Sequence, residues 1–190
     1  MKRIAGTIGI LLILTVFLSF TDGGYTGAQQ VSSLLTEEEV DSLLLMREEE
    51  KLARDVYTVL YQKWGLRIFS NIATSEQRHM DSVKVLLDRY GIQDPVKDNQ
   101  TGKFTSPELA KLYDELVERG TKSLLDALIV GANIEELDIK DLIESSSKTD
   151  KADIKMVYDN LKRGSENHLE AFIRQITLRG GSYTSKYITE

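Results

Sequence analysis

Apolar side chains recur every three or four positions along most of the chain beyond residue 36, which is the spacing that places them on one face of a helix. The first such stretch follows a capping box, in which Thr36 and Glu39 can each bond the other's backbone N–H. Gly65 follows the last apolar residue of this stretch and is a typical helix stop. These signals predict a helix at residues 37–64.

Four further stretches carry the same helical spacing. The first predicts a helix capped by Ser70 or Asn71 that reaches Tyr90, and the second a short helix from Ser106 to Gly120. The third predicts a helix capped by Ser123 that reaches about Ser145. The last predicts a helix that Asp150 opens, with Asp153 three residues on, and that reaches about Arg179. Both prolines of the chain, Pro95 and Pro107, lie in one turn-rich segment, which is therefore a crossover with a helical insert. No alternating pattern of useful length predicts a strand. The expected fold is all-α: an antiparallel four-helix bundle with a short extra helix in the connection between its second and third long helices.

The first residues have the pattern of a secretory signal. Lys2 and Arg3 precede an almost wholly apolar run from Ile4 to Phe20, and small residues follow it up to Ala28. The same run is at the short end of a bilayer span, so an uncleaved membrane anchor is the alternative. We therefore expect an exported protein with a signal peptide at 1–28, a linker at 29–35, a helical domain at 36–180 and a coil tail at 181–190.

Composition narrows the classes of function. With 190 residues, 41% of them hydrophobic and 28% charged, the chain can bury one substantial core. Its net charge of -6 becomes about -7 without residues 1–28, which argues against nucleic acid and anionic membrane surfaces as partners. The absence of cysteine excludes disulfides, thiol catalysis, iron–sulfur clusters and cysteine zinc sites.

Ionisable residues interrupt the apolar stripe of every long predicted helix. They are Glu50 on the first, Glu76 and His79 on the second, Glu135 and Asp138 on the third, and His168 on the fourth. Buried carboxylates lose hydration and repel one another, so a cation is expected between them. Carboxylate oxygen with imidazole nitrogen suits iron, manganese or zinc, and a glutamate three residues before a histidine lets both reach one ion. A hydrogen-bonded polar core without metal is the alternative.

The fourth long helix departs from a symmetrical di-metal pattern. Three residues before His168 stands Ser165, and Glu166 lies one residue off the stripe. Glu136, Asp138 or Glu166 could supply the missing carboxylate, or water could take its place; otherwise the site holds a single ion. Tyr57, two turns after Glu50, can bond a ligand or simply pack in the core. Gly131 and Gly164 each precede a candidate ligand by one turn, which leaves room for a small oxidant or for a close helix crossing.

Several segments resemble a known family. EEEKLARDVY around Glu50 is similar to the first helix of rubrerythrin-type ferritin-like proteins, and SEQRHMDSV matches their Glu-x-x-His at Glu76 and His79. From about Leu35 to Leu178, including LYDELVERG, VGANIEELDI and GSENHLEAF, the chain resembles the ferritin-like family of domain of unknown function 2202. The resemblance implies a ferritin-like bundle with Glu50, Glu76, His79, Glu135 and His168 as metal ligands.

Two functions remain open at this point. The first is an exported non-haem iron protein, with one or two ions, that reacts with dioxygen or peroxide as a ferroxidase or a peroxide reductase. It would lack a rubredoxin electron-transfer module, which needs cysteines. The second is a non-catalytic binding or structural module of the cell envelope with a buried network of Glu and His. The sequence leaves open the metal, the reaction and whether the chain forms a homo-oligomer.

Overall fold

The computed structural model describes residues 34–187, which form five helices and no strand. The signal peptide and most of the linker expected at 1–35 lie outside these residues. The first helix, α1 (Glu37–Trp64), has the predicted bounds. Its capping box is formed, with Thr36 N donating to Glu39 Oε2 at 2.7 Å and Glu39 N donating to Thr36 Oγ1 at 3.2 Å. Gly65 ends it in the left-handed conformation, at φ 65°.

The second helix, α2 (Arg67–Arg89), begins earlier than predicted. Ser70 does not cap it; its hydroxyl donates back to Arg67 O at 3.1 Å from within the first turn. The left-handed turn at Gly65 reverses the chain immediately, so the helix can resume after only two residues. Leu66 occupies the N-cap position without a side-chain hydrogen bond, and the burial of Phe69 in the core takes the place of a polar cap.

The remaining helices are α3 (Pro107–Gly120), α4 (Leu124–Ser147) and α5 (Ala152–Thr177). Ser106 and Ser123 cap α3 and α4 as predicted, each accepting a backbone N–H three residues on. The N-cap of α5 is Lys151, which makes no side-chain cap bond. Asp153 lies in the first turn of α5 and accepts hydrogen bonds from Arg89 and Tyr90 of α2 instead.

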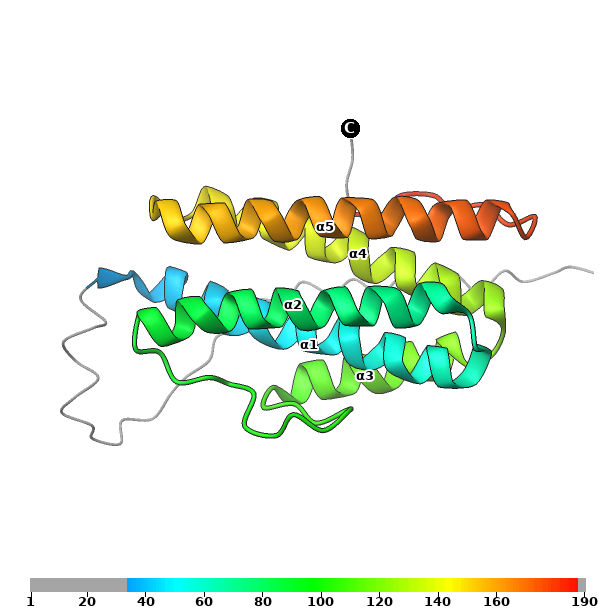
Figure 1. Ribbon diagram of the computed structural model, residues 1–190, viewed down its shortest axis with the longest axis horizontal. Helices are drawn as coiled ribbons and strands as arrows, with labels where there is room; N and C mark the ends of the chain where they lie inside the picture. The colour runs from blue at the N-terminus through cyan, green and yellow to red at the C-terminus, as the bar shows by residue number, and fades with distance from the viewer. Residues whose placement is uncertain (1–33, 188–190) are drawn as a thin grey trace, which may run out of the picture.

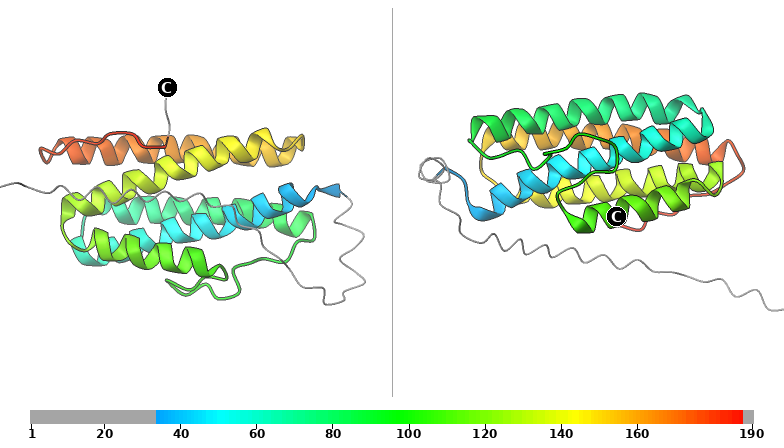
Figure 2. Two further views of the ribbon diagram at one scale, coloured as in Figure 1. Left: turned by 180° about the vertical axis from the view of Figure 1, so that it is seen from behind. Right: turned by 90° about the horizontal axis from the view of Figure 1, so that it is seen from below.

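The four long helices lie side by side as two hairpins, α1 with α2 and α4 with α5 (Figure 1). Within each hairpin the helices run in opposite directions (Figure 1). The short helix α3 packs on α1 and α4, away from α2 and α5 (Figure 2). An all-helical bundle with an extra helix in the α2–α4 connection is therefore confirmed.

The core consists of two apolar clusters at different heights along the bundle. One contains Val56, Phe69, Leu128 and Phe172 among others. The second contains Met46, Val83, Leu142, Leu161 and neighbouring residues. On each long helix the candidate metal ligands come between the residues of the two clusters in the sequence. These candidate ligands, which we call the polar centre, are thus enclosed between two apolar layers.

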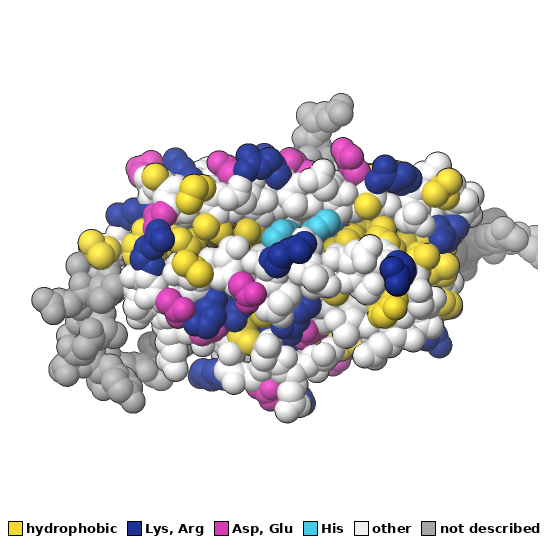
Figure 3. Space-filling model, viewed as in Figure 1, with side chains coloured by type: hydrophobic (Ala, Val, Ile, Leu, Met, Phe, Trp, Pro, Cys, Tyr) yellow, Lys and Arg dark blue, Asp and Glu magenta, His cyan; other side chains and the backbone are white. Residues whose placement is uncertain are grey.

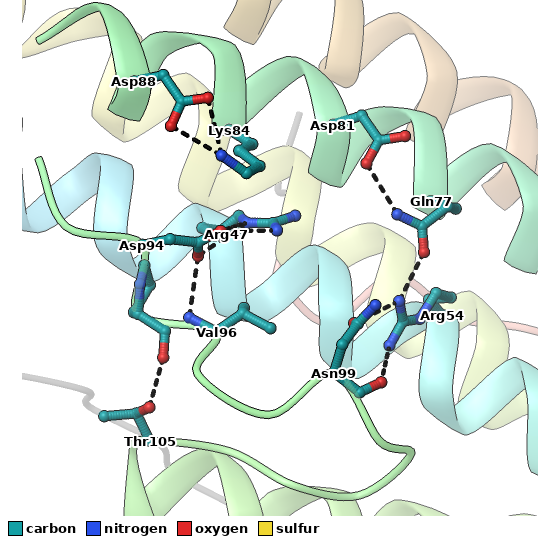
Figure 4. Close-up of polar contacts among 11 residues, drawn as sticks. Arg47, Arg54, Gln77, Asp81, Lys84, Asp88, Asp94, Val96, Asn99 and Thr105 are labelled. Atoms are coloured by element: carbon teal, nitrogen blue, oxygen red, sulfur yellow. Dashed lines mark hydrogen bonds and ion pairs between the residues drawn. The ribbon is translucent and has the colours of Figure 1, made fainter. Parts of the chain in front are cut away.

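The segment that connects α2 to α3 is attached to the outer face of α1 (Figure 4). Arg47 pairs with Asp94 at 3.0 Å, and Arg54 Nη1 donates to Asn99 Oδ1 at 2.8 Å. Lys51, fully buried, donates to Gln100 O at 2.8 Å and lies over the Phe104 ring. These bonds fix the crossover without using any residue of the polar centre.

The C-terminal tail is coil over its described part, as predicted, and lies against α4. The carboxylate of Glu136 holds it by accepting hydrogen bonds from Tyr183 Oη at 2.6 Å, Lys186 N at 2.8 Å and Tyr187 N at 3.0 Å. Within residues 34–187, no helix combines the length and the apolar character that crossing a membrane requires.

Candidate metal centre

Four helices bring the five principal candidates together at mid-height in the bundle. Glu50 comes from α1, Glu76 and His79 from α2, Glu135 from α4 and His168 from α5. The three glutamates are 1–2% exposed, whereas the two imidazoles are 12% and 13% exposed. The carboxylates therefore lie inside the bundle and the imidazoles at its edge.

These side chains form two similar groups. In the first, His79 Nδ1 lies 2.7 Å from Glu76 Oε2 and 3.2 Å from Glu50 Oε2. In the second, His168 Nδ1 lies 2.9 Å from Glu76 Oε1 and 3.3 Å from Glu135 Oε2. Each group has one imidazole nitrogen and two carboxylates whose ligand atoms all lie within 4.8 Å of one another. Glu76 belongs to both groups and gives one oxygen to each.

The spacing of the atoms in each group is that of ligands around one ion. Ligands about 2.1 Å from a common metal and at right angles to each other lie about 3 Å apart. The four Nδ1–oxygen distances, from 2.7 to 3.3 Å, bracket this value. A single Nδ1–H can point well at only one acceptor, yet each imidazole faces two carboxylates. An ion among the three atoms could contact all of them.

Two carboxylate oxygens of this centre are buried without a hydrogen-bond partner. They are Glu50 Oε1 and Glu76 Oε1. Glu76 Oε1 lies close to His168 Nδ1, but the angle between them is not that of a hydrogen bond. Buried polar atoms are nearly always satisfied in folded proteins, and an unmet one costs about 1–3 kcal/mol. Both oxygens therefore favour a cation as the missing partner.

The pKa values of the centre reflect the close contact between its buried carboxylates and imidazoles. Burial opposes charge on Glu76, but the neighbouring imidazoles of His168 and His79 bring its pKa to about 2. Burial also opposes charge on the imidazoles, but their carboxylate partners raise the pKa of His79 to about 11 and that of His168 to about 10. Burial raises the pKa of Glu135 to about 7. Without a metal, protons hold the groups together, and an incoming cation must displace them.

Tyr57 supports the centre from the first apolar cluster. Its ring packs against Phe69 and Phe172, with centroids 6.4 Å and 5.4 Å away. Its hydroxyl donates to Glu135 Oε1 at 2.5 Å. Burial, together with the charge of Glu135, raises the pKa of Tyr57 well above its usual range, so the hydroxyl keeps its proton. Tyr57 therefore both packs in the core and orients Glu135.

Ser165 and Asp138 occupy the place where a symmetrical site would have a further glutamate. Ser165 Oγ donates to Asp138 Oδ2 at 2.5 Å. Burial raises the pKa of Asp138 to about 8, and the nearby charges of Glu135 and Glu76 add to the shift. Asp138 thus lies beside the centre, although it belongs to neither three-residue group.

Two of the additional candidates do not face the centre. The carboxylate of Glu136 points to the opposite side of α4, because successive residues on a helix face different directions, and it holds the C-terminal tail. Glu166 is exposed, and its Oε1 lies 3.5 Å from Lys162 Nζ. The prediction that either residue supplies the missing carboxylate is corrected by these positions.

The two glycines near the ligands leave no room for an oxidant. A Cβ at Gly131 would lie 2.5 Å from the Phe172 ring, and one at Gly164 would lie 2.6 Å from His79 Nε2. Side chains from neighbouring helices already fill both spaces. The close-packing alternative is therefore the correct interpretation of both residues.

Gly164→Ala should weaken metal binding more than it weakens the fold. The added methyl group would push the His79 ring, whose position a bound ion would fix. We expect metal affinity to fall about tenfold, while alanine's better helix propensity offsets part of the strain in the metal-free protein. Competition titration with a zinc chelator measures the affinity. Gly131→Ala is the matched control, because it strains Phe172 and should lower the melting temperature instead.

The imidazoles mark the side from which the centre can be reached. On the face shown in Figure 3, both histidines come to the surface along the line where α2 and α5 meet. Their Nδ1 atoms point inward at the carboxylates, so the outer ring edges are what solvent meets. Any small molecule arriving from this side would pass along the histidines.

Sequence reasoning missed two acidic residues that act on each other across α1 and α4, Glu49 and Asp141. Glu49 Oε2 is buried without a hydrogen-bond partner, and the charge of Asp141 acts on it. The available signals were weak: Glu49 directly precedes Glu50, and Asp141 follows Asp138 by one helical turn. Adjacent acids and acids one helical turn apart are also common on solvated helix faces.

Comparisons with known proteins identify the family. The family model described as an uncharacterized protein domain, DUF2202, matches residues 39–190. An uncharacterized protein of Methanocaldococcus jannaschii, MJ0754, is 55% identical in an alignment of 166 positions that covers 85% of this chain and 90% of that protein. The crystal structure of hypothetical protein MJ0754 from Methanococcus jannaschii superimposes with a TM-score of 0.81 at 57% identity, covering 82% of this chain and 89% of that chain. The chain therefore belongs to the DUF2202 family.

Proposed function

We propose that this protein is a ferritin-like bundle that binds two metal ions, one in each Glu–His group, with Glu76 as the bridge between them. One observation carries the proposal: two groups of one histidine and two glutamates share a single buried carboxylate. Helical bundles that hold two metal ions use the same kinds of residue from four facing helices. Glu50 and Glu135 would each bind one ion from the outside.

Iron is the metal that we propose, with manganese or zinc as the other candidates that the ligands suit. The donors are carboxylate oxygen and imidazole nitrogen, without any sulfur, since the chain has no cysteine. Bound iron would supply one-electron redox chemistry. The protein's own residues would hold the ions, keep bulk water out through the apolar layers on both sides, and fix Glu135 through the Tyr57 hydroxyl.

The reaction that we propose is the oxidation of Fe(II) to Fe(III) with dioxygen or peroxide as the electron acceptor. Such acceptors are small enough to approach past the partly exposed imidazoles, whereas the glutamates are almost fully buried. We also propose that the protein is exported by its N-terminal segment. Comparing the rate of Fe(II) oxidation with dioxygen and with peroxide would identify the acceptor.

Elemental analysis tests the metal site itself. Wild-type protein refolded with Fe(II), Mn(II) or Zn(II) should retain about two ions per chain after desalting. The variant with His79→Ala and His168→Ala should retain less than half an ion, because each group loses its nitrogen ligand. Equal, sub-stoichiometric metal in both proteins would overturn the proposal and favour a hydrogen-bonded Glu/His core in a structural module.

A further inference from the structure

The crossover between α2 and α3 carries a short sequence motif that plays no part in the metal centre. Asn99, Gln100 and Thr101 form an Asn-x-Thr sequence, and all three residues are exposed. This is the motif to which N-linked oligosaccharides are attached on the surface loops of secreted proteins. None of the other four asparagines of the chain has serine or threonine two residues later. Asn99 is therefore the one asparagine of this sequence that meets the requirement.

The side chain of Asn99 is held by its oxygen. Arg54 Nη1 donates to Asn99 Oδ1 at 2.8 Å, and Arg54 Nη2 donates to Asn99 O at 3.3 Å (Figure 4). Since a guanidinium only donates hydrogen bonds, the amide must turn its oxygen to Arg54. Among residues 34–187, none accepts a hydrogen bond from Asn99 Nδ2. The nitrogen that would carry a glycan is thus free, and the oxygen that anchors the side chain is one that attachment leaves intact.

The backbone around Thr101 is fixed to α1, whereas the Thr101 side chain is not. Lys51 donates to Gln100 O at 2.8 Å, and Gly102 N donates to Asp55 Oδ2 at 3.0 Å. Thr101 is exposed, and its hydroxyl makes no hydrogen bond within the part of the chain that the structure describes. The hydroxyl therefore has no role in the fold, and its removal should leave the contacts between the crossover and α1 unchanged.

A hollow in the surface begins beside this motif. It lies between α1 and α2, has a volume of about 340 Å³ and is lined by Arg54, Thr58, Tyr61 and Gln77 among others. Arg54 Nη1 donates to Gln77 Oε1 at 2.6 Å as well as to Asn99, so the hollow and the motif share this guanidinium (Figure 4). Small-ligand sites span about 300–1,000 Å³. Hydroxyl and amide groups beside a partly exposed tyrosine ring suit a sugar, which combines polar edges with an apolar face.

We propose that Asn99 is an acceptor for an N-linked oligosaccharide. The sugar comes from an activated donor, a glycosyl diphosphate lipid. The bond between its anomeric carbon and the phosphate oxygen breaks, the anomeric carbon bonds Asn99 Nδ2, the nitrogen gives up one proton, and the lipid diphosphate leaves as an anion. Asn99 Oδ1 keeps its hydrogen bond with Arg54. The inference rests on the proposed export of the protein and uses no residue of the proposed metal centre.

The test is to produce the full chain in a cell that glycosylates its exported proteins and to measure the mass of the tryptic peptide at residues 98–103. Cleavage after Lys97 and Lys103 gives a peptide whose only asparagine is Asn99. In wild-type protein most of this peptide should carry a glycan. Thr101→Val, which removes the hydroxyl but keeps the shape, should lose the glycan, whereas Thr101→Ser, which keeps the hydroxyl, should retain it. Made without glycosylation, both variants should melt at the wild-type temperature.

A second form of the chain separates this inference from the proposed export. It carries an export leader of known function placed before residue 1. If only this form is glycosylated, the acceptor site stands and the protein's own N-terminal segment does not export it. An unmodified 98–103 peptide in the exported second form would overturn the acceptor site, as would a modification that survives Thr101→Val.

Discussion

Glu76→Gln should reduce bound metal from two ions per chain to well below one, the largest loss that any single substitution at the centre can cause. Each oxygen of Glu76 faces a different histidine, at 2.7 Å and 2.9 Å, so the change removes an anionic ligand from both groups at once. An amide offers one neutral oxygen and an NH₂ group that cannot bind a cation. Elemental analysis after loading with Fe(II) or Zn(II) measures the result.

Two matched variants show whether the loss of metal arises because both groups share Glu76. Glu135→Gln removes a ligand from one group only and should leave about one ion per chain. Glu166→Gln changes an exposed glutamate that pairs with Lys162, and should leave both ions in place. If Glu76→Gln and Glu135→Gln lost metal equally, with one ion remaining in each, Glu76 would not be a bridge.

Metal-free protein should be less stable at pH 8 than at pH 5, by about 3 kcal/mol or more. The folded pKa of Glu135 is raised to about 7 and that of Asp138 to about 8, so the folded state holds protons that the unfolded chain has released. Stability therefore falls as the pH rises from their unfolded pKa values, near 4, through 7–8. Both histidines have raised pKa values too, so their contribution is lost progressively as the pH rises from 6.5, their unfolded pKa, to about 10–11, their folded pKa. Glu76, with a lowered pKa, loses its contribution only below about pH 4.5.

Bound metal should reverse this pH dependence. A cation needs ionised carboxylates and neutral imidazoles, so its affinity rises with pH, and it binds only the folded site. We expect the melting temperature at pH 8 to rise by about 10 °C on adding Zn(II) or Mn(II), and by much less at pH 5. Differential scanning calorimetry with and without a chelator makes the comparison. Chelator-independent melting at pH 8 would argue that the buried groups are satisfied without an ion.

The helices and their inward faces could be predicted because both depend on local signals. Thr36, Glu39 and Gly65 define α1 with the bounds that the structure has. α2 begins before the predicted cap because Ser70, although a residue type that favours N-caps, lies within the first turn, and Phe69 before it is buried in the core. Inward-facing ligands follow from helical periodicity, which is why Glu50, Glu76, His79, Glu135 and His168 converge.

What the sequence could not predict depends on how the helices are placed against one another. The two oxygens of Glu76 face different histidines, and this depends on how far α2 is shifted along its axis relative to α5. Glu136 adjoins Glu135 in the sequence and is therefore a candidate for the missing carboxylate, but only the path of the tail reveals its partner. Glu49 and Asp141 look like solvated charges until α1 and α4 are seen to bring them together.

Anomalous X-ray diffraction from crystals of the metal-loaded protein tests the central claim most directly. Data collected at the absorption edge of the metal should show two strong peaks, one between Glu50, Glu76 and His79 and the other between Glu76, Glu135 and His168. A single peak, or none, at these five side chains in crystals grown with excess metal would contradict a two-ion centre bridged by Glu76.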